Sequence, residues 1–249
     1  MKRSERRLRD IELVEDLHLT DIGENDARES AFQVSLNLAE TIASQGSKKE
    51  NYHGATVLNG YAKQRLVDSL KVDSVHRRYG TGAGVIAVID TGIDPFHPAL
   101  ERSLVPGYDF IFDEPGYASE RKELDPELSQ LLIESGFGTV DQSSVAILSQ
   151  SSVAILDQSS VAILSQPEYQ SFGHGTMVAG VVRLFAPDAK IMPLKAFRPD
   201  GTASTANIVD AIYFAVENGA DIINMSFSFE TFSEETMRAI NHATRQGVI

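Results

Sequence analysis

Apolar runs alternate with amphipathic stretches along most of this chain, and turn residues separate them. Residues 85–89 form an apolar run without a polar interruption, which is typical of a strand buried on both faces of a parallel sheet. Further strands are predicted over residues 105–111, 190–197 and 221–226. Pro193 has no amide for the ladder of a central strand, so the sequence predicts a bulge at that point.

Apolar residues at helical spacing fill the intervals between the later strands. One predicted helix opens within residues 171–180 and ends at Pro187. A second is stopped by Gly219, and a third is closed by Gly247. The alternation predicts right-handed crossovers and an α/β fold, a three-layer parallel sheet with helices on both faces. Residues 248–249 begin a further strand, so we expect the sheet to be incomplete at the C-terminus.

The N-terminal region differs in composition and switches from basic to acidic within its first 26 residues. An amphipathic helix is predicted over residues 27–44, and a linker follows at 46–50. We interpret residues 1–60 as a charged leader or pro-segment-like region, and residues 61–249 as the main domain. That domain is predicted to open with a helix over residues 61–79. The apolar stripe of this helix consists of Leu66, Leu70 and Val75.

Residues 113–170 interrupt the alternation and are interpreted as an inserted segment. A short helix is predicted over residues 124–135, and residues 143–166 then repeat one octapeptide as SSVAILSQ, SSVAILDQ and SSVAILSQ. Each octad places a four-residue apolar run between polar turns, which suits stacked rungs or hairpins. A low-complexity expansion without fixed structure suits the pattern equally well. The scarcity of charge makes the octads a candidate element for protein contacts or aggregation.

Length, composition and net charge narrow the classes of function that this chain can have. The 249 residues are 42% hydrophobic, which suits a globular domain with a core. A net charge of −13, with no basic stripe, argues against a nucleic-acid partner. The absence of cysteine excludes disulfides, thiol catalysis and cysteine-based zinc sites. No apolar run approaches the roughly 18 residues of a membrane span, and the basic N-terminus lacks the apolar stretch of a secretory signal peptide, so the compartment stays open.

Two candidate binding features have simpler explanations. The glycines of residues 80–84 precede a strand and lack the third glycine of a dinucleotide-binding turn, which follows its strand and opens a helix. They are interpreted as a flexible turn. His97 lies in a loop between Phe96 and Pro98 and has no second ligand at metal spacing, so a structural role is favoured.

Asp90 and His174 are the candidates for acid–base chemistry. Asp90 ends the buried strand, and clefts in open α/β sheets lie at the carboxyl ends of strands. His174 stands at the head of a predicted buried helix. A carboxylate paired with an imidazole holds the ring in one tautomer and stabilises the imidazolium that forms. The alternatives are a turn or cap role for Asp90 and a core position for His174.

Three motifs in this chain resemble those of the subtilisin-like serine proteases. They are AVIDTGID at residues 87–94 with His97 and Pro98, GHGTMVAG at 173–180, and DIINMS at 221–226. The motifs occur in the family's order, Asp before His, and the resemblance covers residues 62–112 and 171–249. It implies a subtilisin-like fold and serine endopeptidase activity. It also implies that Asp90 orients the base and that His174 is the general base.

The resemblance further implies a substrate channel for an extended polypeptide. Ser226 and Phe227 match the edge strand that pairs with substrate in the family, and Gly201 and Thr202 match the opposite wall. Peptide binding between these walls would be strand addition, with affinity from backbone hydrogen bonds. An ordinary serine at the end of a strand is the alternative for Ser226.

The sequence departs from the family pattern at the residues that would complete the catalytic site. It contains neither the Gly-Thr-Ser-like block with the nucleophile nor the oxyanion asparagine. Losing one oxyanion donor alone costs about 3–4 kcal/mol of transition-state stabilisation. Met177 replaces the second histidine of His-Gly-Thr-His, and Ala99 stands where many members have a calcium-binding aspartate. The calcium loop after the histidine helix is also missing, so we expect no metal and no cofactor.

These observations leave three hypotheses. The first is a subtilisin-class serine endopeptidase, present as an N-terminal portion that holds the Asp and His but not the Ser and is inactive alone. The second is a non-catalytic peptide-binding or interaction module on the same fold, with the octads as its contact element. The third treats residues 90–92 as the Asp-Thr-Gly of an aspartic protease, which requires a β-rich fold and a second triplet. A reading frame that continues into an Asn motif and a Gly-Thr-Ser block would favour the first over the second.

Overall fold

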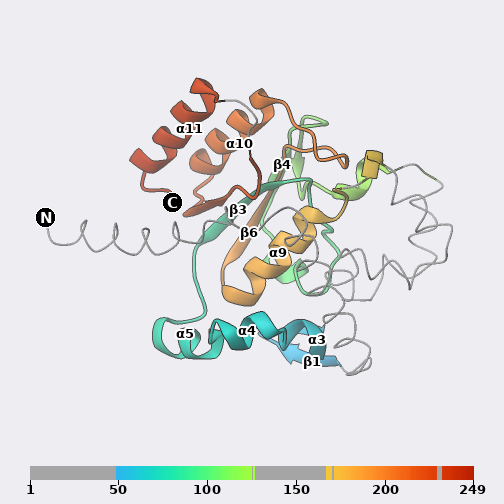
Figure 1. The fold of residues 1–249 in the computed structure, drawn as a ribbon, viewed down its shortest axis with the longest axis vertical. Coiled ribbons are helices and arrows are strands. Elements are labelled where there is room, and N and C mark those ends of the chain that lie inside the picture. Colours follow the sequence, from blue (N-terminus) through green and yellow to red (C-terminus); the bar gives the residue numbers. More distant parts are fainter. Residues whose placement is uncertain (1–48, 125, 127–166, 170, 229–231) are drawn as a thin grey trace, which may run out of the picture. The chain divides into compact units, whose positions relative to one another are not determined.

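A five-stranded sheet forms the centre of the fold (Figure 1). The computed structural model describes residues 49–124, 126, 167–169, 171–228 and 232–249. Across the sheet the strand order is β5-β4-β6-β3-β7. The strands are β5 (Glu114–Gly116), β4 (Gly107–Asp109), β6 (Lys190–Lys195), β3 (Val85–Asp90) and β7 (Ile222–Asn224).

Most neighbouring strands in this sheet are parallel. β3 pairs with β6 over its whole length, from Val85 opposite Lys190 to Asp90 opposite Lys195, and with β7 on its other edge. β4 is parallel to β6, while the short β5 is antiparallel to β4. The predicted strands are present, although β4 and β7 are shorter than predicted and β5 was not predicted. β3 therefore has a strand on each side over Ile86–Val88, while its carboxyl end at Asp90 pairs with β6 alone.

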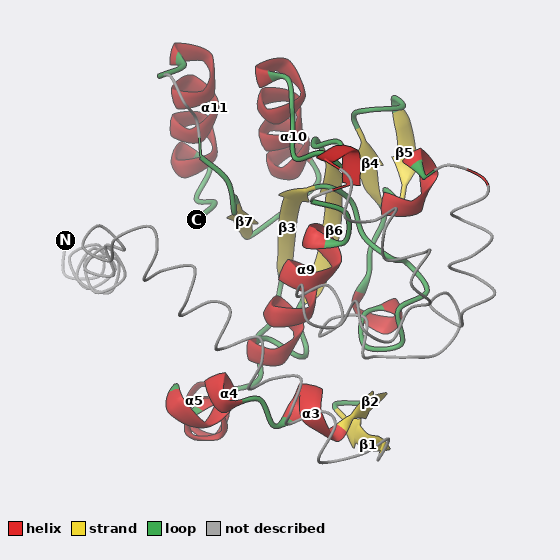
Figure 2. Cartoon of the chain, turned by 45° about the vertical axis from the view of Figure 1, so that its right-hand side comes forward, coloured by secondary structure: helices red, strands yellow, loops and turns green. Residues whose placement is uncertain are grey.

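Helices lie on both faces of the sheet (Figure 2). α9 (His174–Phe185) packs in the apolar cluster that contains Ile86 and Val88 of β3. α10 (Thr205–Glu217) and α11 (Glu234–Arg245) pack in the cluster that contains Ala87 and Ile89. Successive strand residues point to opposite faces, so a strand covered on both sides needs an unbroken apolar run. The predicted three-layer α/β architecture is confirmed.

Pro193 does not cause the predicted bulge. The register between β3 and β6 continues without interruption through the pair Val88–Pro193. The amides of Lys190 and Ala196 both donate toward β3. Alternate residues of a strand direct their amides to the same neighbour, so the amide that Pro193 lacks falls on the β4 side. The ladder between β3 and β6 is therefore intact.

Five short elements precede β3. They are β1 (Lys49–Tyr52), β2 (Ala55–Leu58), α3 (Asn59–Ala62), α4 (Arg65–Ser69) and α5 (Val72–Tyr79). The single helix predicted over residues 61–79 is wrong, because Lys71 adopts a left-handed backbone (φ 53°) between α4 and α5. The residues of its predicted stripe are all exposed: Leu66, Leu70 and Val75. Val67 and Val72 are buried in their place, because the segment is divided into three short helices that do not keep one helical phase.

The hairpin of β1 and β2 packs, together with α3, against α9. The hydroxyl of Tyr52 donates to the carbonyl oxygen of Leu184 at 2.7 Å, and the hydroxyl of Tyr61 donates to that of Gly180 at 2.8 Å. Packing against α9 therefore begins ahead of residue 60. Residues 49–50 lie in β1 and not in the linker that the sequence predicted.

The predicted insertion over residues 113–170 is described only at its two ends. Residues 113–124 contain β5 and the 3₁₀ helix η2 (Glu120–Glu123), and both Glu120 and Leu124 are buried. This part thus belongs to the packed fold. Three predictions lie outside the described residues: the helix over 27–44, most of the helix over 124–135, and the octads at 143–166. Within the described ranges, no helix has the length and apolar character needed to cross a membrane.

Candidate active site

β3 brings Asp90 to the carboxyl edge of the sheet. Asp90 is only 4% exposed, and Lys195 of β6 lies opposite it in the sheet. Its Oδ1 accepts a hydrogen bond from the amide of Thr91 at 2.7 Å. The apolar run of β3 thus ends in a buried carboxylate whose polar partners come from the turn that follows and from α9.

His174, the first residue of α9, contacts this carboxylate. Its Nδ1 lies 2.8 Å from Oδ1 and 3.0 Å from Oδ2 of Asp90, so the predicted contact between the two side chains is present. The hydrogen bond to Asp90 raises the pKa of His174, and partial burial of the ring opposes that rise. A carboxylate acceptor places the ring proton on Nδ1 and leaves the lone pair on Nε2. The pair therefore holds an imidazole in the tautomer that a general base needs.

The start of α9 is joined directly to the turn after Asp90. α9 has no side-chain cap of its own, and the amide of Gly175 donates instead to the hydroxyl oxygen of Thr91 at 3.1 Å. A Cβ at position 175 would lie 2.0 Å from the carbonyl oxygen of Gly92 and 3.2 Å from Cβ of Asp90. Only glycine permits this approach, which sets His174 beside Asp90.

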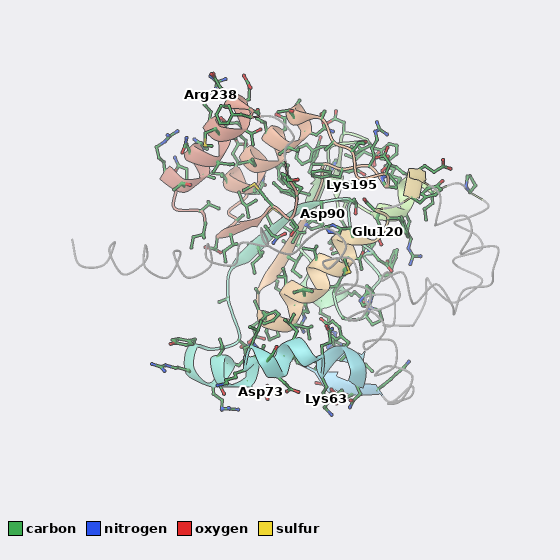
Figure 3. All side chains as sticks on the ribbon, in the orientation of Figure 1. Lys63, Asp73, Asp90, Glu120, Lys195 and Arg238 are labelled. Atoms are coloured by element: carbon green, nitrogen blue, oxygen red, sulfur yellow. The ribbon has the colours of Figure 1, made fainter. Side chains whose placement is uncertain are left out.

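Buried charged groups that were not predicted from the sequence lie behind this turn. Lys195 has no exposed surface, and its Nζ donates to the carbonyl oxygen of Thr91 at 2.6 Å. The same Nζ lies 2.8 Å from Oε2 of Glu123. Figure 3 shows Lys195 and Glu120 in the region of Asp90. The sequence signal for Lys195 was a cation in the interior of a predicted strand that is otherwise apolar after its first residue, Lys190.

A second polar group adjoins the first. Arg121 lies 2.8 Å from Oδ2 of Asp94, and the amide of Asp94 donates to the hydroxyl of Thr176 in α9 at 2.7 Å. Burial raises the pKa of Glu120 to about 8, while a hydrogen bond from Thr176 acts in the opposite direction. These contacts connect η2, the loop after β3 and the first turn of α9.

A cleft of about 160 Å³ opens beside the Asp90–His174 pair. Its walls come from the ends of β3 and β6, the start of α9, the loop before α10 and the segment after β7. The lining residues are Asp90, Thr91, Ser171, His174, Phe197, Gly201, Ser226 and Phe227. Ser171 and Phe197 were not predicted to line a cleft, because neither is a residue to which the family resemblance assigns a role.

The structure brings three of the four predicted substrate-binding residues to this cleft. Gly201, Ser226 and Phe227 line it. Thr202 lies instead in a neighbouring pocket, and its amide and hydroxyl both donate to Oδ1 of Asp200, at 2.8 and 2.7 Å. The tight turn around Gly201 directs adjacent residues to different sides, so only one of the two faces the cleft.

The loop around Ala99 contains a buried histidine that accepts a hydrogen bond. Among the residues described by the structure, no three His, Asp or Glu side chains come together as ligands. Ala99 is buried, and its amide donates to Nδ1 of His97 at 3.2 Å. Burial lowers the pKa of His97 to about 4, so the ring is neutral and serves as an acceptor within its own loop.

Comparisons with known proteins match the part of the chain that forms this site. A thermophilic serine proteinase from Bacillus sp. (strain AK1) is 23% identical over 180 residues, 68% of this chain and 32% of the relative. The minor extracellular protease Vpr from Bacillus subtilis (strain 168) is 27% identical over 180 residues, 68% of this chain and 17% of the relative. An intracellular serine protease from Paenibacillus polymyxa is 25% identical over 178 residues, 68% of this chain and 40% of the relative.

The chain thus spans less than half of the length of each of these relatives. A family model described as Subtilase family matches residues 80–249, which contain β3, α9 and all residues of the cleft. That match covers more than half of the 249 residues. The chain belongs to the subtilase family.

Proposed function

We propose that this chain carries the acid–base part of a serine endopeptidase site, with His174 as general base and Asp90 as the carboxylate that orients it. The observation that carries the proposal is the 2.8 Å contact between Nδ1 of His174 and Oδ1 of Asp90 at the wall of a cleft. Membership of the subtilase family supports the same chemistry.

The chemistry follows from the tautomer. With the Nδ1 proton held by Asp90, Nε2 of His174 accepts the proton of a seryl hydroxyl as its oxygen attacks the carbonyl carbon of the scissile peptide. The Asp90 carboxylate stabilises the resulting imidazolium. The imidazolium then gives its proton to the leaving amine as the C–N bond breaks, which leaves an acyl-enzyme for water to hydrolyse.

The proposed substrate is an extended polypeptide bound between two walls. Ser226 and Phe227 form one side of the cleft, and Gly201 lies on the other. The rings of Phe227 and Phe197 lie 4.8 Å apart and give the cleft an apolar surface for a substrate side chain. A peptide in this channel is bound as an added strand, with affinity from backbone hydrogen bonds.

The motif that carries the family's nucleophile does not occur in residues 1–249. These residues contain no Gly-Thr-Ser-like block and no matching oxyanion asparagine. We therefore propose that residues 1–249 do not hydrolyse peptides by themselves, and that turnover requires a polypeptide that supplies the nucleophile.

The test has two parts. Purified residues 1–249 are incubated with a fluorogenic peptide and with a serine-directed acylating inhibitor, and we expect neither hydrolysis nor labelling. The chain is then combined with the serine-bearing portion of a related subtilase, and kcat is measured for Asp90→Asn. We expect a loss of about 10⁴-fold, because the imidazole is then held in the wrong tautomer.

The exposed Asp210→Asn on α10 is the matched control and should keep full activity. Inhibitor-sensitive turnover by residues 1–249 alone would show that a nucleophile is present after all. A completed chain that binds peptide without cleaving it would favour the non-catalytic peptide-binding module.

A further inference from the structure

Lys195 is a fully buried cation placed directly behind the proposed active-site pair. In the register of β3 and β6 it lies opposite Asp90, and none of its surface is exposed. Burying an ammonium group is strongly unfavourable unless the group is paired and hydrogen-bonded. An aliphatic residue would fill the same place in the sheet without that cost. The cation at this position therefore calls for an explanation beyond packing.

The partners of Lys195 show where its hydrogen bonds act. Nζ donates to the carbonyl oxygen of Thr91 at 2.6 Å and forms an ion pair with Oε2 of Glu123 at 2.8 Å. The side chain of Glu123 is itself only 9% exposed, and its Oε1 lies 3.2 Å from Arg198. Lys195 thus connects the turn after β3 with η2, and Glu123 fixes the position of its charge.

Thr91 is the point at which these contacts reach the proposed active site. Its amide donates to Oδ1 of Asp90 at 2.7 Å, and its hydroxyl oxygen accepts from the amide of Gly175, the residue after His174, at 3.1 Å. Its carbonyl oxygen accepts from Lys195. Three polar groups of one residue therefore tie Asp90, the first turn of α9 and the buried cation together. A shift of the Thr91 peptide would move Asp90 and His174 relative to each other.

We propose that Lys195, held by Glu123, is a positioning residue for the Asp90–His174 pair and acts through the carbonyl group of Thr91. The inference rests on the proposed function, in which that pair orients a general base. Lys195 does not line the cleft, so its effect is on geometry and not on contact with substrate. Hydrogen-bonded groups around a site hold the reacting side chains within the narrow range of productive geometry.

The test measures the protonation of His174 directly and does not require catalytic turnover. The titration of His174 and the resonance of its Nδ1 proton are measured by NMR on the whole 249-residue chain, with the signals assigned from a His174→Gln sample. The main variant is Lys195→Met combined with Glu123→Gln. It removes one charge of each sign, so the direct electrostatic effect on His174 largely cancels and the loss of positioning remains. The control is Lys190→Met on the same strand, where Nζ donates to the carbonyl oxygen of Arg102 at 3.0 Å but the residue is exposed.

We expect the double variant to move the pKa of His174 down toward the ordinary histidine value and to broaden or abolish the Nδ1 proton signal. Lys190→Met should leave both unchanged. Glu123→Asp gives a milder test if the double variant does not fold, because it keeps every charge and withdraws the carboxylate by one methylene. We expect a smaller change in the same direction. An unchanged His174 titration in either folded variant would overturn the proposal.

The same spectra separate this proposal from the proposed function. If Asp90→Asn does not lower the pKa of His174, the Asp90–His174 pair itself is absent in solution and the proposed function fails. If Asp90→Asn lowers that pKa and the Lys195 variants do not, only the positioning role of Lys195 is lost.

Discussion

Glu120 offers a test of the buried charges because its carboxyl group is almost entirely removed from water. The residue is 4% exposed, and its Oε2 has no hydrogen-bond partner among the described residues. Burial raises its pKa to about 8. A hydrogen bond from Thr176 and the cations Lys195 and Arg121 oppose the rise, while Asp94 adds to it. Near neutral pH the folded chain therefore holds a proton on Glu120 that the unfolded chain, with a glutamate pKa of 4.5, has lost.

This difference sets the sign and size of a pH effect on stability. A group whose folded pKa is raised contributes its full stability below the unfolded pKa and loses it as pH rises through the folded pKa. For Glu120 the loss runs from about pH 4.5 to pH 8, at up to about 1.4 kcal/mol for each pH unit. Glu120→Gln cannot titrate. Relative to the natural chain, we expect its free energy of unfolding to rise by about 4 kcal/mol between pH 5 and pH 8.

The measurement is urea denaturation of both chains at half-unit steps from pH 5 to pH 8.5. His174 also has a raised pKa, so it adds a loss of stability of the same sign above its unfolded pKa of 6.5. That contribution is common to both chains and cancels in the difference. Glu101→Gln, at an exposed glutamate, serves as the control and should give a difference that is flat with pH. A flat difference for Glu120→Gln as well would refute the reasoning, because it would mean that Glu120 is already ionised in the folded chain at pH 5.

Two further predictions concern the helices that cover the sheet. Ser204→Ala removes the hydroxyl that accepts from the amide of Asn207 at 3.1 Å and caps α10, so we expect the free energy of unfolding to fall by about 1 kcal/mol in urea denaturation. An unchanged midpoint would show that the cap contributes nothing. Tyr61→Phe leaves the buried carbonyl oxygen of Gly180 without its hydroxyl donor, and we expect a loss of about 1–2 kcal/mol. A chain of equal or greater stability would mean that this hydrogen bond is not made in solution.

The layers of the fold and the proposed pair of active-site residues could both be predicted from the sequence. The apolar run before Asp90 is typical of a strand buried on both faces, and the amphipathic stretches predict the helices that cover those faces. Parallel strands bring their carboxyl ends to one edge, so the residue that follows the run had to lie at that edge. The contact with His174 then followed from the family motifs, whose order the chain keeps.

What the sequence did not reveal depends on contacts between distant segments. Lys195 interrupts an apolar predicted strand, but nothing in the sequence shows that its partner is Glu123, which lies in a segment without a pattern. The stripe predicted over residues 61–79 failed for a local reason, because the segment is broken after α3 and again at the left-handed Lys71, so no single helical phase extends through it. Thr202 was predicted to line the cleft from the family resemblance. That resemblance does not decide which of two adjacent turn residues faces the cleft.

The raised pKa of Glu120 also bears on the proposed chemistry, through the charge balance behind the cleft. Apart from Glu120 and His174, the ion pairs there contain three carboxylates and three cations: Asp90, Asp94, Glu123, Arg121, Lys195 and Arg198. With Glu120 protonated, these carboxylates and cations are equal in number. An ionised Glu120 would add an unmatched negative charge, and it would compete for Lys195 and Arg121, the two cations that lower its pKa. A neutral Glu120 therefore leaves Lys195 to the Thr91 carbonyl oxygen and Glu123, and leaves Arg121 to Asp94, so the contacts behind the proposed pair are not shared with a further carboxylate.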